Sequence, residues 1–242
     1  MRIRKWLLAV LVAAGLSAAT YAVGLYRDAH PEDETAFLFD LLDVGTGAVV
    51  AEIGAGQGHM TLAAARLVGP SGKVYSAELD QAQLEALQRS AHNSGVSNVL
   101  TVRGSEVTTN LPEGCCDVIF MSKVYHHFTR PREMNASLYK ALKPGGRLAV
   151  IDFEPRWWRF WLRLPAGVPG NRGGHGMPIG ILVEEMTAAG FRLERSISDW
   201  WSFPEQRYCL VFQRTESRSW APSHNEIVSS RHIRVSSFRS RE

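Results

Sequence analysis

Glu52-Ile53-Gly54-Ala55-Gly56-Gln57-Gly58 is the stretch that decides the fold of this 242-residue chain. An apolar run at residues 48–51 precedes it and a helical pattern at residues 61–68 follows it, so the pattern predicts a strand, a glycine-rich turn and a helix. Glycine at positions 54 and 56 permits a tight turn and close approach of the backbone to a ligand. The helix directs its unpaired N–H groups and the positive end of its dipole toward the same place.

An acidic residue ends the next apolar run. Residues 73–77 predict a second strand, and Glu78 stands at its tip. A carboxylate in this position accepts hydrogen bonds from the hydroxyls of a ribose. The alternative is a solvated acid that begins the following helix, where a negative charge suits the helix dipole. The turn and the acid together predict a nucleoside-cofactor site.

The spacing of the glycines distinguishes between two cofactors. The dinucleotide fingerprint requires glycine at its first, third and sixth positions, but the sixth position here is His59 and the third glycine comes one residue earlier, at Gly58. The stretch therefore departs from the NAD pattern. It resembles motif I of class I S-adenosylmethionine (SAM)-dependent methyltransferases.

Further stretches resemble the same family, in its order and spacing, across residues 36–214. Residues 98–104 resemble its third strand, residues 116–121 its fourth strand, and residues 142–148 its next helix end, turn and fifth strand. The resemblance implies an α/β fold, a Rossmann-like three-layer sandwich with a seven-stranded, mostly parallel sheet and an antiparallel last strand. The methyltransferase domain is expected at residues 31–214.

The sequence pattern also predicts individual elements. Helices are expected at residues 36–44, 80–94, 132–143 and 177–189, after a polar hinge at residues 27–35. Pro144 and Gly145 are expected to stop the third of these helices, with Gly145 as its C-cap. Strands at residues 191–199 and 207–214 are expected to form an antiparallel hairpin at the edge of the sheet.

The resemblance implies that SAM is the cofactor and indicates which residues bind it. Glu52 is expected to help hold the ammonium end of the cofactor, the alternative being a carboxylate that only caps the turn. Ser105 or Glu106 replaces the aspartate that often contacts the adenine in this family. The full set of expected cofactor-binding residues is Glu52, Gly54, Ala55, Gly56, Gly58, Glu78, Leu79, Gly104, Ser105, Glu106 and Ser122.

The residues after the fourth strand bear on the type of reaction. Enzymes of this fold that methylate nucleobase amines carry (Asp/Asn)-Pro-Pro-(Tyr/Phe) there, whereas this chain has Ser122-Lys123-Val124-Tyr125-His126-His127. The sequence instead resembles the small-molecule branch, including quinone-biosynthesis C-methyltransferases. Tyr125, His126 and His127 are the candidate catalytic residues, because histidine can act as a general base near neutral pH. The alternatives are that the histidines pack under the sheet or cap a helix, and that positioning alone drives the reaction.

Composition excludes several functional classes. A net charge of +3 is too small to predict nucleic-acid binding. Cys115 and Cys116 have no partners at metal-ligand spacing, so no metal site is expected and the pair is interpreted as a strand entry.

The N-terminus predicts a membrane segment. Arg2, Arg4 and Lys5 precede an uncharged stretch at residues 6–26, which has the length of a bilayer span. A retained anchor, a cleaved signal peptide and a mitochondrial transit segment all remain open for residues 1–26. The protein is therefore expected to be membrane-associated, or exported if the segment is cleaved. The positive charges before the segment and the acids after it favour a domain on the non-cytoplasmic side, which conflicts with the supply of SAM that is expected mainly in the cytosol or the mitochondrial matrix.

Two later segments complete the predictions. Residues 156–164 alternate Arg with Trp, Phe and Leu, a pattern that predicts either an amphipathic helix at a membrane surface or an ordinary packed helix. Residues 215–242 are rich in Ser and Arg and are predicted to be disordered. The functional hypothesis is methyl transfer from SAM to a small, apolar or lipid-like acceptor, and the alternative is a SAM-binding scaffold without turnover.

Overall fold

A computed structural model describes residues 31–155, 166–172, 174–200 and 207–215 of the chain. Strands and helices alternate through most of this part, as the sequence pattern predicted. The strands are β1 (Val49–Ile53), β2 (Lys73–Glu78), β3 (Val99–Arg103), β4 (Cys116–Ser122), β5 (Leu142–Phe153), β6 (Phe191–Trp200) and β7 (Arg207–Arg214). The helices are α2 (Pro31–Leu41), α3 (His59–Val68), α4 (Gln81–Asn93), α5 (Pro131–Ala141) and α6 (Ile179–Ala188), with short 3₁₀ helices η1 (Tyr125–His127) and η3 (Gly170–Arg172).

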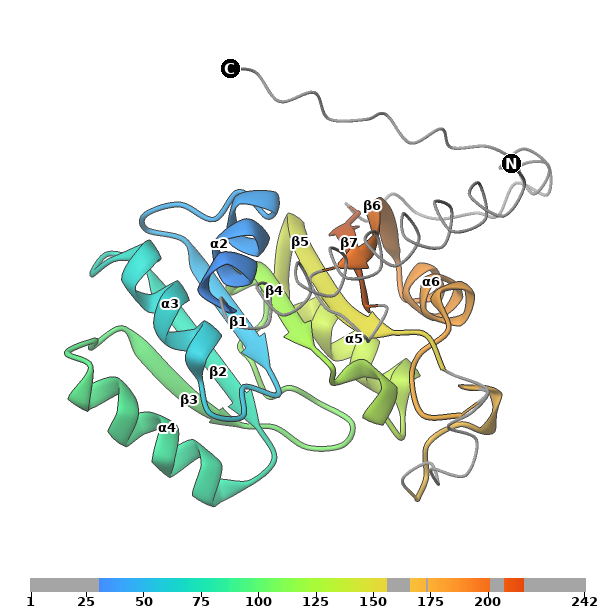
Figure 1. Ribbon diagram of the computed structural model, residues 1–242, viewed down its shortest axis with the longest axis horizontal. Coiled ribbons are helices and arrows are strands. Elements are labelled where there is room, and N and C mark those ends of the chain that lie inside the picture. Colours follow the sequence, from blue (N-terminus) through green and yellow to red (C-terminus); the bar gives the residue numbers. More distant parts are fainter. Residues whose placement is uncertain (1–30, 156–165, 173, 201–206, 216–242) are drawn as a thin grey trace, which may run out of the picture.

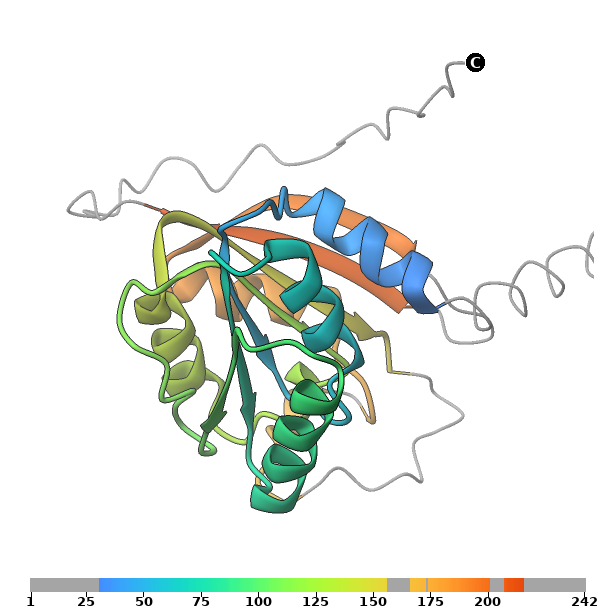
Figure 2. The ribbon, with the colours of Figure 1, turned by 90° about the vertical axis from the view of Figure 1, so that its left-hand side faces the viewer.

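The strands form one seven-stranded sheet in the order β3-β2-β1-β4-β5-β7-β6. Neighbouring strands from β3 to β5 are parallel, whereas β7 is antiparallel to both β5 and β6. Helices α2, α3 and α4 cover one face, and α5 and α6 cover the other (Figures 1 and 2). The predicted α/β sandwich with an antiparallel last strand is therefore confirmed.

The two-residue period of the strands divides the core between the two faces. Val50 of β1 packs in the cluster beneath α2 and α3, whereas Ala51 and Ile53 of the same strand pack in the cluster on the side of α5 and α6. A side chain of β1 can therefore reach a cavity only if that cavity lies on the same face of the sheet as the side chain.

Three predicted boundaries are wrong. Helix α2 ends at Leu41 rather than at residue 44. Residues 31–35 belong to helix α2 rather than to a polar hinge, because three acids in its first turn suit the positive end of the helix dipole. Helix α5 ends at Ala141 rather than at residue 143, and its C-cap is Leu142 rather than Gly145. Leu142 pairs with Cys116 in the sheet, and the register then shifts so that Val118 pairs with Arg147. Gly145 lies in this irregular part of β5, with a φ of 76°.

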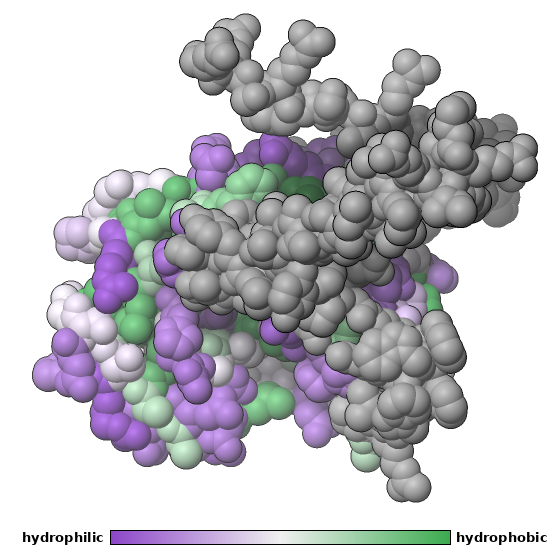
Figure 3. Space-filling view, viewed as in Figure 1, coloured by the Kyte–Doolittle hydropathy of each residue, from purple (hydrophilic) through white to green (hydrophobic). Residues whose placement is uncertain are grey.

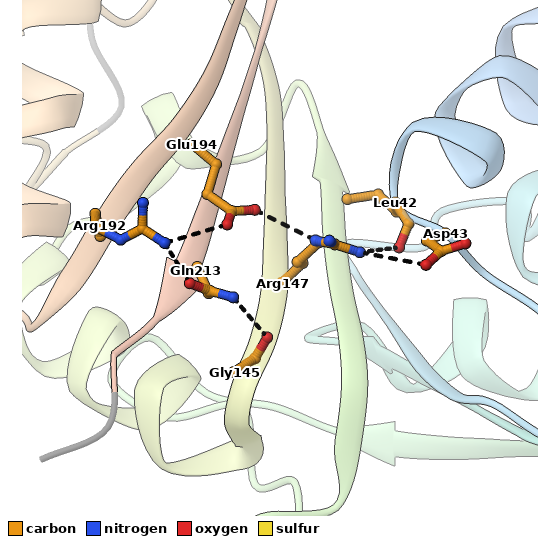
Figure 4. A network of polar contacts seen from close by, with 7 residues as sticks. All are labelled: Leu42, Asp43, Gly145, Arg147, Arg192, Glu194 and Gln213. Carbon is orange, nitrogen blue, oxygen red and sulfur yellow. Dashed lines mark hydrogen bonds and ion pairs between the residues drawn. The ribbon is translucent and has the colours of Figure 1, made fainter.

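A polar network ties the antiparallel end of the sheet to the end of α2 (Figure 4). The Arg147 guanidinium on β5 donates to Glu194 of β6 at 3.3 Å and to the Leu42 carbonyl at 3.3 Å. Gln213 of β7 donates to the Gly145 carbonyl at 3.3 Å. These bonds lie near the N-terminal end of β5. They hold the β6–β7 hairpin in place and lie away from the carboxyl ends of the parallel strands.

Three predicted segments lie outside the described residues: the N-terminal segment at residues 1–26, the aromatic segment at residues 156–164, and the tail from residue 216 onward. Among the residues that are described, no helix is both long enough and apolar enough to cross a bilayer. Polar and apolar side chains are interspersed over the described surface that Figure 3 presents. This distribution is typical of globular proteins.

Candidate cofactor and acceptor site

A cavity of about 510 Å³ opens at the carboxyl ends of the parallel strands, where open α/β sheets bind their ligands. Its volume falls in the range of sites for small molecules and cofactors, roughly 300–1,000 Å³. Its walls come from the ends of β1 and β2, the loop after β3, the segment after β4 and the start of α5. The lining side chains and backbone groups belong to Ile53, Gly54, Ala77, Glu78, Leu79, Gln83, Gly104, Ser105, Glu106, Thr108, Thr109, Val124, His127, Phe128, Thr129, Met134 and Ala166.

The glycine turn requires its glycines for two separate reasons. Gly54 and Gly58 have φ values of 71° and 77°, which L side chains rarely adopt. A Cβ at Gly54 would lie 2.5 Å from Cγ2 of Val124, and a Cβ at Gly58 would lie 1.9 Å from Cδ1 of Leu87. The turn is thus packed against both α4 and the segment after β4, and only Gly54 of the three glycines lines the cavity.

Glu78 lies at the tip of β2 and lines the cavity, as the sequence predicted. Its Oε2 accepts a hydrogen bond from the Gly56 N–H at 3.2 Å, and its Oε1 accepts one from the Leu79 N–H at 2.8 Å. The carboxylate is therefore held by the glycine turn itself. A carboxylate has about four lone-pair sites, so each oxygen can still accept a hydrogen bond from a ligand in the cavity.

Glu52 lies on the other face of the sheet. Strand alternation places its side chain opposite that of Ile53, which lines the cavity. Glu52 is 6% exposed, and its carboxyl accepts a 2.5 Å hydrogen bond from the Thr61 hydroxyl of α3. It is not among the residues that line the cavity, which disagrees with the expectation that it helps to hold the ammonium end of the cofactor, directly or through water. In this structure its hydrogen bond with Thr61 joins β1 to α3.

Burial raises the pKa of Glu52 to about 8, against the opposing effect of the hydrogen bonds from Thr61. In the unfolded chain the same carboxyl titrates near 4.5, so between these values the folded protein holds a proton that the unfolded chain has lost. The free energy of unfolding should therefore fall as the pH rises from about 4.5 to about 8. For one proton the slope approaches about 1.4 kcal/mol per pH unit.

Glu52→Gln should remove this pH dependence, because the amide cannot ionise. Urea unfolding of the variant and of the wild type at a series of pH values measures the effect. The expected result is a variant that gains stability relative to the wild type as the pH rises through this window. Glu85→Gln, at an exposed acid on α4, is the matched control. Parallel stability curves for Glu52→Gln and wild type would contradict the assignment of a buried, protonated carboxyl.

The loop after β3 supplies the far end of the cavity. Gly104, Ser105 and Glu106 all line it, and their predicted contact with an adenine stays a prediction. The Ser105 hydroxyl accepts hydrogen bonds from the Val107 and Thr108 N–H groups at 3.3 and 3.2 Å, so it is occupied in shaping the loop. Glu106 accepts a bond from the Thr129 hydroxyl at 3.2 Å. Leu79 is 52% exposed against this part of the cavity, where its apolar surface can contact a flat ring.

The segment after β4 separates the three candidate catalytic side chains. Tyr125 is fully buried, and its hydroxyl donates to Glu185 of α6 at 2.8 Å while it accepts from Asn135 of α5 at 2.7 Å. Burial raises the pKa of Tyr125. The structure therefore places Tyr125 in the core between α5 and α6 and not in the cavity, which corrects the prediction that it acts on the acceptor.

His126 and His127 have different surroundings although they are neighbours. His126 is 2% exposed, and its Nδ1 lies 2.8 Å from Oδ1 of the buried Asp152 at the end of β5. His127 is the histidine that lines the cavity. Partial burial lowers the pKa of His127, the neighbouring His126 and His175 lower it further, and Asp152 acts in the opposite direction.

Ser122 belongs to a different cavity. Together with Lys123 it lines a space of about 700 Å³ that is also bounded by Phe39 of α2 and Met60 of α3. The structure therefore brings together Gly54, Glu78, Leu79, Gly104, Ser105, Glu106 and His127 of the predicted site residues, and leaves Glu52, Ala55, Gly56, Gly58, Ser122, Tyr125 and His126 outside the lining of that cavity.

Comparison with known proteins identifies the domain. Residues 51–150 match the family described as "Methyltransferase domain". The chain carries a methyltransferase domain. The chain is also 32% identical over 119 residues to the ubiquinone/menaquinone biosynthesis C-methyltransferase UbiE of Escherichia fergusonii, covering 49% of this chain and 47% of that protein. The corresponding protein of Escherichia coli O1:K1 is 33% identical over the same coverage. The chain thus spans about half the length of the curated relatives it matches.

Solved structures share the fold of the methyltransferase domain. A SAM-dependent methyltransferase from Aquifex aeolicus superposes with a TM-score of 0.62 at 20% identity, over 75% of this chain and 89% of that one. The structure described as the [4+2]-cyclase SpnF superposes with a TM-score of 0.61 at 15% identity, over 76% of this chain and 81% of that one. At these identities the superpositions show the fold alone.

SAM is the cofactor of the methyltransferase domain, and the residues of the cavity fit it. Glu78, Gly54 and Leu79 all line the cavity; a carboxylate can accept hydrogen bonds from ribose hydroxyls, glycine permits close approach of a ligand to the turn, and leucine offers an apolar surface. Sequence reasoning missed Gln83, Thr108, Phe128, Thr129 and Met134 as lining residues. Their residue types carry no specific signal in the sequence, because their side chains reach the cavity through the paths of loops and the starts of α4 and α5.

Proposed function

We propose that the chain transfers a methyl group from SAM to a small acceptor that is apolar or lipid-like. The observation that carries the proposal is the single cavity that joins Glu78, at the end of β2, to His127, after β4. The first offers oxygen acceptors for a nucleoside. The second offers a neutral nitrogen beside apolar Val124, Phe128 and Met134. The match of residues 51–150 to a methyltransferase domain supports the same reaction.

The finer proposal is that the acceptor is a hydroquinone-like ring methylated on carbon. The similarity to enzymes named as ubiquinone/menaquinone biosynthesis C-methyltransferases supports it. The apolar residues beside His127 suit a ring with an alkyl chain. We also propose that residues 6–26 attach the protein to a membrane, where such acceptors reside; their length and lack of charge support this.

Bound SAM would supply an electrophilic methyl on a sulfonium sulfur. Glu78 would fix the ribose, and the glycine turn would position the methionine part, so that the acceptor carbon meets the methyl in line with the sulfur. The new carbon–carbon bond forms as the sulfur–carbon bond breaks, and the sulfur keeps the electron pair as a neutral thioether. His127 would accept the proton of the ring hydroxyl. Removing that proton raises the electron density of the ring carbon that is methylated. After methyl transfer, the hydrogen on that carbon would leave as a proton to solvent, and its electron pair would restore the aromatic ring.

Turnover with methyl-labelled SAM tests the proposal directly. The purified full-length chain should transfer label to a reduced, alkylated hydroquinone with an unsubstituted ring carbon. Label should not pass to the same ring with that carbon already methylated. His127→Ala should lower kcat by about 10²–10⁴-fold, the usual contribution of general acid–base catalysis, with a much smaller change in SAM affinity. His92→Ala, at an exposed histidine of α4, is the control.

The rival function is a SAM-binding scaffold without methyl transfer. A fold neighbour described as a [4+2]-cyclase favours keeping this candidate, because the fold itself does not specify methyl transfer. Isothermal titration of the same preparation with SAM, read together with the label-transfer assay, distinguishes the two functions. Binding without label transfer to the hydroquinone, to a fatty acid or to an alkyl amine would contradict the enzyme and support the scaffold.

A further inference from the structure

We infer that three histidines at the carboxyl ends of β4 and β5 form a binding site for a divalent transition-metal ion. His126 and His127 come from η1, and His175 comes from the segment before α6. Each offers one ring nitrogen, and these nitrogens lie within 4.8 Å of one another. Tetrahedral zinc with bonds of about 2.0–2.1 Å to nitrogen needs its ligands about 3.4 Å apart. A modest inward rotation of the side chains would therefore bring the nitrogens around one ion.

His126 is already oriented as a metal ligand would be. Its Nδ1 lies 2.8 Å from Oδ1 of Asp152, and its backbone N–H donates to Oδ2 of the same carboxylate at 3.2 Å. Asp152 is fully buried. Metal-binding histidines usually donate one ring N–H to a carboxylate, which fixes the ring and raises the basicity of the other nitrogen. Nε2 of His126 is thus the nitrogen left for an ion.

His175 is brought to the cluster by close backbone packing against the end of β5. The Met177 N–H donates to the Phe153 carbonyl at 2.8 Å. Gly176 passes so close that a Cβ there would lie 2.8 Å from the same carbonyl oxygen. The His175 ring centroid consequently lies 4.9 Å from that of His126. This segment is 49 residues from His126 in the sequence, so the cluster is a product of the fold.

The ligand set selects the kind of ion. Imidazole nitrogen suits Zn²⁺, Cu²⁺, Fe²⁺ and Ni²⁺, whereas Mg²⁺ and Ca²⁺ prefer oxygen. Three protein ligands leave one tetrahedral position open, as in catalytic zinc sites. Because His127 lines the cavity, that position would be reached from the acceptor side. There the ion could bind the acceptor oxygen and lower the pKa of its hydroxyl. With the ion bound, His127 acts as a ligand and the hydroxyl proton leaves to solvent, whereas His127 serves as the base only in the ion-free protein. This last consequence rests on the proposed function, but ion binding does not.

The competing explanation is a packed cluster of rings without an ion. Phe153 lies 4.9 Å from His126 and 5.2 Å from His175 between ring centroids, so the rings do form an aromatic wall. Such a wall would bind no metal with defined stoichiometry. The two explanations therefore differ in a quantity that can be measured without SAM and without an acceptor.

Metal titration of the full-length chain, purified without a histidine tag and freed of metal by a chelator, tests the inference. Zn²⁺ is titrated against a chromophoric chelator, and Co²⁺ is followed by its visible absorption, which reports tetrahedral coordination. The expected result is equimolar Zn²⁺ binding. His127→Ala and His175→Ala should each weaken it by at least ~100-fold, and Asp152→Asn by about 10–100-fold, as for other orienting carboxylates. Mg²⁺ should not compete.

The controls separate ion binding from folding and from the proposed function. His92→Ala should leave Zn²⁺ affinity unchanged, and thermal melting in chelator checks that each variant is folded. His127 and His175 are not buried, so their variants should fold even if Asp152→Asn does not. Equal Zn²⁺ binding by wild type and by the His127→Ala/His175→Ala double variant would overturn the inference. SAM calorimetry on the same samples reports the proposed function separately, since loss of SAM binding does not alter the metal result.

Discussion

Glu78→Ala is expected to weaken SAM binding by at least about tenfold, and by more than about 100-fold if both ribose hydroxyls are bound, because each hydrogen bond to a charged group is worth about 1.5–3 kcal/mol. The carboxylate lines the cavity and is held by the N–H groups of Gly56 and Leu79. Its position is therefore set before the cofactor arrives, and little binding energy is spent on ordering it. Isothermal titration with SAM measures the loss, and Glu85→Ala on the exposed face of α4 is the matched control.

A second ligand shows whether the lost energy belongs to the ribose. Wild-type protein should bind S-adenosylhomocysteine more tightly than its 2′-deoxy analogue, whereas Glu78→Ala should bind the two almost equally. This comparison removes the contribution that Glu78 makes to the glycine turn, because that contribution affects both ligands alike. If the variant still discriminates between the two ligands as strongly as the wild type, Glu78 does not bind the 2′ hydroxyl.

Sequence reasoning predicted the turn and Glu78 well because their placement is local. A strand, a tight turn and a helix position Gly54 within a few residues, and parallel pairing of β1 with β2 brings the tip of β2 beside it. The order of these elements was therefore enough to predict that Gly54 and Glu78 lie beside one another at the cavity, and the binding of a nucleoside there stays a prediction.

It was harder to predict which face of the sheet, or which side of a turn, holds a given side chain. Glu52 was expected at the cofactor, but strand alternation turns its carboxyl toward Thr61 of α3. The sequence gives the alternation but does not say which face holds the ligand, and a buried acid is rare enough to suggest function. Tyr125 was misassigned for a related reason. A short 3₁₀ turn has too few residues for a hydrophobic period, so nothing in the sequence separates the buried Tyr125 from the cavity-lining His127.

Long-range pairs were beyond prediction. Asp152 and His175 join His126 only because β5 lies beside β4 and the segment before α6 packs back on the end of β5. Asp152 did carry one usable signal, since it is a charged residue within the apolar end of a parallel strand. Charged residues are almost never fully buried without a partner, and its position should have prompted a search for one.

Gly54→Ala is expected to abolish measurable SAM binding, because two independent effects oppose the new methyl group. The φ of 71° at Gly54 is unfavourable for alanine, at a cost of roughly 1–2 kcal/mol. The added Cβ would also lie 2.5 Å from Cγ2 and 3.1 Å from Cγ1 of Val124, which forces the turn away from the segment that carries His127. The glycine turn and the segment after β4, which form two walls of the cavity, would then both be displaced.

The double variant Gly54→Ala/Val124→Ala separates these two effects. Removing both Cγ atoms leaves the Val124 Cβ as the nearest atom, at 3.4 Å, so the steric clash is relieved while the φ cost remains. SAM affinity should recover in the double variant to within about 5–30-fold of Val124→Ala alone, the residual that corresponds to a backbone cost of about 1–2 kcal/mol. Thermal melting of all three variants controls for folding. No recovery in a folded double variant would mean that the turn depends on glycine through its backbone conformation alone, and that contact with Val124 does not position it.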